Sequence, residues 1–76
     1  MKKRKELINE MIDDYQRKII HNELTIEIYE DMLENLPDGE QMTLMGSIAG
    51  FRGQNLSDNK MLLKLKERKR IYEKKT

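Results

Sequence analysis

The sequence contains no cysteine, no tryptophan and only one histidine among its 76 residues. Without cysteine the chain can form no disulfide, and a zinc site built from one histidine and carboxylates alone would be uncommon. Aromatic residues make up 5% of the chain, which leaves little material to enclose a catalytic pocket. We therefore expect no metal, no cofactor and no enzymatic activity.

Long hydrophobic runs are absent as well. The longest run without a charged side chain is residues 41–51, which would span roughly 16 Å as a helix, too little to cross a bilayer. The basic residues 2–5 lead into a charged segment and not into the apolar stretch of a signal peptide. We expect a cytoplasmic protein without a membrane partner.

Proline and glycine are also scarce, and neither occurs between residues 4 and 36. In this segment apolar residues recur at alternating gaps of four and three, the heptad pattern of a helix that packs on another helix. The seam defined by this pattern consists of Ile8, Ile12, Tyr15, Ile19, Asn22, Ile26, Tyr29, Leu33 and Leu36. We predict a helix over residues 4–36, roughly 50 Å long, with the seam as an oligomer interface.

The seam is nearly symmetric about Asn22, because Tyr15 and Tyr29 lie seven residues to either side of it. Such a helix can pack on an antiparallel copy of itself, which sets the basic start of one chain beside the acidic residues 34–40 of the other. A chain of this size buries only about 60% of its unfolded surface when it folds alone, which also favours association. Asn22 would either face its twin at the crossing point or lie at the rim of the interface.

The remaining residues predict a turn and two further helices. The Pro-Asp-Gly sequence at residues 37–39 favours a turn after the long helix. Residues 41–51 then predict a short, glycine-rich helix that is buried on both sides. Ser57 is a suitable N-cap and predicts a final, basic helix over residues 58–74. The domain is thus divided into a seam helix over residues 4–36, a turn and short helix over residues 37–56, and a basic C-terminal segment over residues 57–76.

Two alternatives remain open for the glycine-rich segment. One is a pair of short strands, and the other is a phosphate-binding loop built from Gly46, Gly50 and Gly53. The loop lacks a preceding strand and the Lys-Ser or Lys-Thr pair found in such loops. We expect the glycines to allow this segment to approach the long helix closely.

A second apolar row, formed by Ile20, Leu24 and Ile28, steps by four along the side of the long helix away from the seam. We expect the rest of the chain to cover this row, and the alternative is an exposed groove for a foreign helix. His21 and the carboxylates of residues 23–34 include no Glu-x-x-His pair, so we interpret them as a solvated face and not as a metal site.

Charge is distributed unevenly, although the net charge is only +1. Residues 19–51 carry seven acidic and no basic side chains, whereas residues 52–76 carry nine basic and three acidic ones. If the final helix folds back along the first, its basic tip approaches residues 2–5, and positive charge gathers at one end of the molecule. The candidate contacts for a partner or for nucleic acid are Lys66, Arg68, Lys69, Arg70, Lys74 and Lys75.

These patterns predict a single all-α domain over residues 1–76, a helical hairpin that pairs antiparallel into a dimeric bundle. They favour a small regulator, adaptor or inhibitor that binds a larger protein. The richness in Lys, Glu, Ile and Asn is typical of AT-rich bacterial or bacteriophage genomes. The alternative is an accessory protein that binds DNA or RNA through the basic tip, unless the acidic end of the second copy neutralises that tip.

Overall fold

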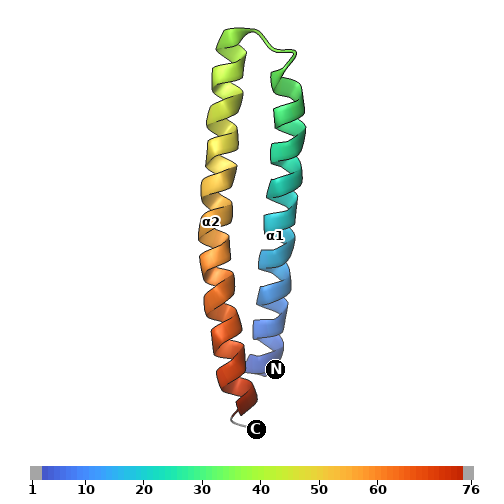
Figure 1. The fold of residues 1–76 in the computed structure, drawn as a ribbon. Coiled ribbons are helices and arrows are strands. Elements are labelled where there is room, and N and C mark those ends of the chain that lie inside the picture. Colours follow the sequence, from blue (N-terminus) through green and yellow to red (C-terminus); the bar gives the residue numbers. More distant parts are fainter. Residues whose placement is uncertain (1–2, 75–76) are drawn as a thin grey trace.

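The computed structural model, which describes residues 3–74, consists of two antiparallel helices joined by a short turn (Figure 1). Helix α1 is Arg4–Leu33 and helix α2 is Asp38–Lys74. Together they form a rod of 58 × 18 × 17 Å, with the start of α1 and the end of α2 at one tip and the turn at the other. The all-α helical hairpin expected from the sequence is confirmed.

The turn begins earlier than predicted, because α1 ends at Leu33 and not at Leu36. The Gln41 side chain explains how the chain can leave the helix here. Its Nε2 donates hydrogen bonds to the backbone oxygens of Leu33 and Leu36, both at 2.9 Å. Carbonyl groups at a helix end have no partner within the helix, so this side chain satisfies one at the end of α1, on Leu33, and another in the turn, on Leu36. Pro37 precedes α2, where its missing N–H costs no hydrogen bond.

Helix α2 is continuous, which corrects the prediction of a short helix over residues 41–51 and a separate one over residues 58–74. Ser57, predicted as an N-cap, lies in the helix interior, and residues 38 and 39 of the predicted turn form its first turn. Gly50, Gly53 and Ser57 favour a break between two helices in the sequence-based prediction. Packing on α1 outweighs their low helix propensity, which costs about 1 kcal/mol for each glycine.

The inner face of α2 has its own heptad pattern, with gaps of three and four along its whole length. These positions are all buried or half-buried: Gln41, Leu44, Ile48, Phe51, Asn55, Asp58, Leu62, Leu65, Lys69 and Tyr72. A helix with this pattern presents one face to a neighbour from end to end. Helix α2 therefore matches α1 in period, although it has 37 residues and α1 has 30.

The seam of α1 packs on this inner face within the same chain. One buried cluster contains Ile8, Ile12, Ile19, Leu62 and Leu65, with Tyr15 and Tyr72 packed against it. Nearer the turn, Ile26 and Ile48 are buried, and the Tyr29 and Phe51 rings meet edge to face with centroids 5.8 Å apart. This corrects the expected use of the seam, because the surface predicted to bind a second copy is occupied by the chain's own second helix.

The outer side of α1 is uncovered, contrary to the expectation that the rest of the chain would bury it. Ile20, Leu24 and Ile28 are 56%, 54% and 58% exposed. Two helices share only one interface, and the seam, with its longer apolar row, takes that interface. The second apolar row is therefore left facing solvent.

The glycines of α2 do not bring it closer to α1, so that expectation is wrong. A Cβ atom added at Gly46, Gly50 or Gly53 would meet no atom within 4 Å. None of the glycines that the structure describes has a positive φ. Neither packing within the hairpin nor backbone geometry requires glycine at these positions.

We predict that Gly50→Ala raises the free energy of unfolding by about 1 kcal/mol, because alanine has the higher helix propensity and its methyl group would contact nothing. Thermal and denaturant unfolding, followed by circular dichroism, measures the change. Gly39→Ala, in the first turn of α2, is the matched control and should change stability less. A loss of stability in Gly50→Ala would show that this position is crowded.

Candidate interaction surfaces

A polar layer interrupts the apolar contact near the middle of the rod. Asn22 Nδ2 donates a hydrogen bond of 2.9 Å to Asn55 Oδ1, and Asn55 Nδ2 donates one of 3.3 Å to the backbone oxygen of Ile19. Asn22 therefore bonds to Asn55 of its own chain, and not to Asn22 of a second copy as the sequence-based hypothesis had it. Sliding one helix along the other would leave buried amide groups without partners, so this layer fixes the register of the hairpin.

Asp58 is, besides Asn55, the other buried polar residue among residues 3–74, and it is only 4% exposed. Gln54 Nε2 donates a hydrogen bond of 2.9 Å to its Oδ1. Its Oδ2 is buried and accepts no hydrogen bond from any residue between 3 and 74. A buried carboxylate oxygen without a donor destabilises the folded state, so Asp58 weakens the packing of the two helices.

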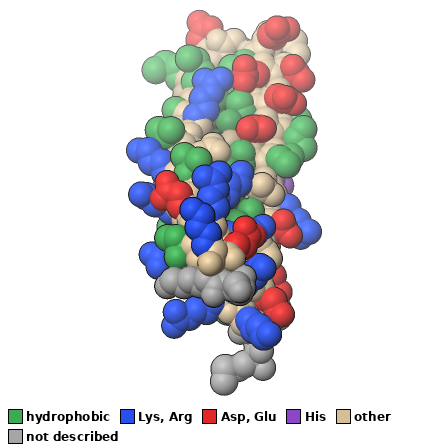
Figure 2. All heavy atoms as spheres, turned by 60° about the horizontal axis from the view of Figure 1, so that its bottom comes forward, with side chains coloured by type: hydrophobic (Ala, Val, Ile, Leu, Met, Phe, Trp, Pro, Cys, Tyr) green, Lys and Arg blue, Asp and Glu red, His purple; other side chains and the backbone are tan. Residues whose placement is uncertain are grey.

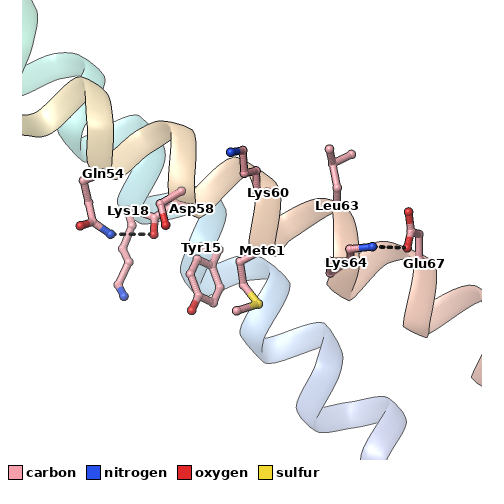
Figure 3. Close-up of a pocket in the computed structure, with 10 residues that line it drawn as sticks. Tyr15, Lys18, Gln54, Asp58, Lys60, Met61, Leu63, Lys64 and Glu67 are labelled. Carbon is pink, nitrogen blue, oxygen red and sulfur yellow. Dashed lines mark hydrogen bonds and ion pairs between the residues drawn. The ribbon is translucent and has the colours of Figure 1, made fainter.

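Asp58 borders a groove of about 690 Å³ between the two helices (Figure 3). Tyr15 and Lys18 line it from α1, with the Lys18 ammonium 5.0 Å from the centroid of the Tyr15 ring. Met61 and Lys64 line it from α2. The groove is a furrow along the rod, and it brings no nucleophile into hydrogen-bond contact with a base. Its arrangement suits packing and not chemistry.

Two sets of apolar side chains lie on the outside of the rod. The outer α1 ridge consists of Ile20, Leu24 and Ile28, and acidic residues are interspersed along it: Glu23, Glu27 and Asp31. The outer α2 row consists of Met42, Ala49, Leu56 and Leu63, spaced by seven residues. The row is missing from the sequence-based predictions. The signal was present, because each of its members directly follows an inner-face residue of the same heptad pattern.

The hairpin also gathers the basic residues. Residues 3–5 lie at the start of α1, at the tip where α2 ends. Figure 2 shows most Lys and Arg toward this near end, with some Asp and Glu among them, and mainly Asp and Glu toward the turn. Of the predicted contact residues, Lys66, Arg68, Arg70 and Lys74 are exposed. Lys69 is half-buried, with its Nζ 4.0 Å from Glu73 Oε1, and Lys75 lies outside the described residues. The rod is therefore positive at one tip and negative at the other.

Residues 3–74 contain no group of three His, Cys, Asp or Glu side chains placed to hold a metal ion. His21 is exposed and stands apart from the inner face. Within the same residues, neither helix has an apolar stretch sufficient to span a membrane.

Comparison of the chain with protein-family models, with curated proteins and with solved structures finds no match in any of the three.

We predict that Asp58→Leu raises the free energy of unfolding by about 1–3 kcal/mol, because it replaces a buried, incompletely paired carboxylate with an apolar side chain at an inner heptad position. Denaturant unfolding measures the change. Asp13→Leu, at an exposed position of α1, is the control and should stay within about 0.5 kcal/mol of the wild type. A less stable Asp58→Leu variant would indicate that the carboxylate has a stabilising partner.

Proposed function

We propose that this chain is a small, non-enzymatic protein-interaction module, a regulator, adaptor or inhibitor that acts by occupying a surface of a larger protein. The observation that carries the proposal is the outer α1 ridge. Three large aliphatic side chains, each more than half exposed, lie on a helix whose other side is already filled by α2. Exposed apolar patches of this kind commonly mark surfaces that bind another protein.

The charges around the ridge specify the chemistry of the target. Glu23, Glu27 and Asp31 are exposed and make no ion pair with another described residue, whereas Glu30 is engaged by Arg52 at 3.2 Å. Two copies of the ridge would bring these acidic residues face to face, which opposes pairing of the ridge with itself. The complementary surface is apolar with a basic border, such as one face of a Lys- or Arg-rich amphipathic helix.

We also propose that the chain is a homodimer in which two hairpins lie antiparallel as a helical bundle. A rod with a positive and a negative tip gains attraction at both ends in this arrangement and repulsion at both ends in the parallel one. The seam is occupied, so the dimer requires another surface. The cytoplasmic location expected from the sequence is part of this proposal.

A DNA- or RNA-binding accessory role is the second candidate. It is supported by the meeting of residues 3–5 with the exposed basic end of α2 at one tip. Such a cluster would contact phosphates without selecting a base sequence.

We predict that a photo-activatable phenylalanine analogue at position 28 cross-links the hairpin to a protein with a basic, apolar surface in extracts of the native host. The purified form of that protein should bind the wild-type hairpin directly. Leu24→Asp should weaken this binding by about 10- to 100-fold, because it places a charge in the centre of the apolar contact. Isothermal titration calorimetry with the purified pair measures the loss.

The matched control is Ile71→Asp, which changes an exposed aliphatic residue near the C-terminal end of α2, away from the ridge. It should leave the affinity for the target unchanged. Equal losses in the two variants, or no loss in Leu24→Asp, would contradict the assignment of the ridge as the binding surface.

The second candidate makes a different prediction. If the basic tip binds nucleic acid, affinity for a random duplex or single strand should be measurable at about 50 mM salt and fall steeply as salt rises. Fluorescence anisotropy with labelled oligonucleotides measures both. No binding at the low salt concentration would exclude this role.

A further inference from the structure

The outer α2 row offers a second apolar surface, separate from the ridge. Met42, Leu56 and Leu63 are 75%, 61% and 63% exposed, more than any other large hydrophobic side chain among residues 3–74. Seven residues make almost two helical turns, so the row stays on one side of α2 over its length. It begins near the turn and ends where the basic segment begins.

We propose that the outer α2 row is the surface on which two copies of the chain pair, with the α2 helices antiparallel. This inference rests on the homodimer in the proposed function and specifies its contact. The spacing of the row is symmetric, because Ala49 and Leu56 lie on either side of its centre and Met42 and Leu63 at its ends. A twofold axis at the centre sets Ala49 opposite Leu56 of the second copy, a small side chain against a large one.

Charge selects the antiparallel direction. With this axis, Glu40 of one copy lies between the levels of Lys64 and Lys66 of the other. Asp38 lies level with Glu67, whose neighbours are Lys66 and Arg68. The acidic residues around the turn, including Glu34 and Glu40, then face the basic end of the second copy. Parallel pairing would instead set Lys66 beside Lys66 and the acidic turns beside each other. Between the ends of the row, residues 42–63 carry three charged side chains: Arg52, which is paired with Glu30 of its own chain, the buried Asp58, and Lys60.

Pairing through the row lies on the exposed side of α2, so it adds an α2–α2 contact and leaves the inner face between α1 and α2 as it is. The apolar row thus becomes buried where the single hairpin leaves it in water.

Single cysteines test the register, since the chain has none of its own. Ala49→Cys and Leu56→Cys are made separately in the full chain, and helicity is checked by circular dichroism. In the proposed register each cysteine lies about 10 Å along the helix from its twin, beyond disulfide reach, but faces the other variant's cysteine. Mild oxidation should therefore cross-link a mixture of the two variants and leave each variant alone largely reduced. Leu24→Cys, on the ridge, is the control and should cross-link with neither.

Leu56→Asp provides an independent readout. Sedimentation should show that the wild type is a dimer and that Leu56→Asp raises its dissociation constant about tenfold or more at unchanged helicity. Leu24→Asp should leave the dimer intact.

The outcomes separate this inference from the proposed function. A dimer that forms no 49–56 cross-link, or that cross-links each variant with itself, overturns the assigned surface and direction but leaves the homodimer. A wild-type monomer at high micromolar concentration overturns both, while target binding through the ridge is judged by its own variants.

Discussion

The fold depends on the mutual burial of two heptad faces that run the length of the chain in opposite directions. Ile8, Ile12 and Ile19 of α1 form one buried cluster with Leu62 and Leu65, which the chain brings back along α1 after the turn. Most of the stability of a helix in a protein comes from the packing of its apolar face, so each helix forms because the other covers it. The direction of α2, the position of the turn and the polarity of the rod all follow from that contact.

Polar residues within this contact favour one alignment of the two helices and lower the stability of the hairpin. The Asn22 and Asn55 amides satisfy each other only in one alignment, and an aliphatic pair would tolerate slippage by a heptad. Asp58 weakens the same region without a comparable hydrogen-bond gain.

The all-α class and the hairpin could be predicted from the sequence, because the seam of α1 is long and nearly unbroken. The continuity of α2 could not, because Asn55 and Asp58 interrupt its apolar pattern and Gly50 and Gly53 lower its helix propensity. Propensity is local, whereas the burial that overrides it comes from residues more than thirty positions away, such as Asn22 and Asn55.

The seam, predicted to be an interface, is covered by α2, and the second apolar row, predicted to be covered, is exposed. Both differences have a related reason. Periodicity shows which residues share a helix face but not which neighbour covers that face. The seam was therefore recognisable, while its partner, the chain's own α2, was not. Ile20 and Leu24 were recognised as a row and expected to be covered, and Leu56 and Leu63 were missed because the predicted break at Ser57 separated them.

Because α1 starts at the tip where α2 ends, a force that pulls these two ends apart acts across the helix pair and not along it. The helices would separate like a zipper, opening one heptad layer after another from the basic tip toward the turn. Resistance at any moment comes from a single layer, so such a rod yields under tension far more readily than one pulled from opposite tips, where all layers must shear together.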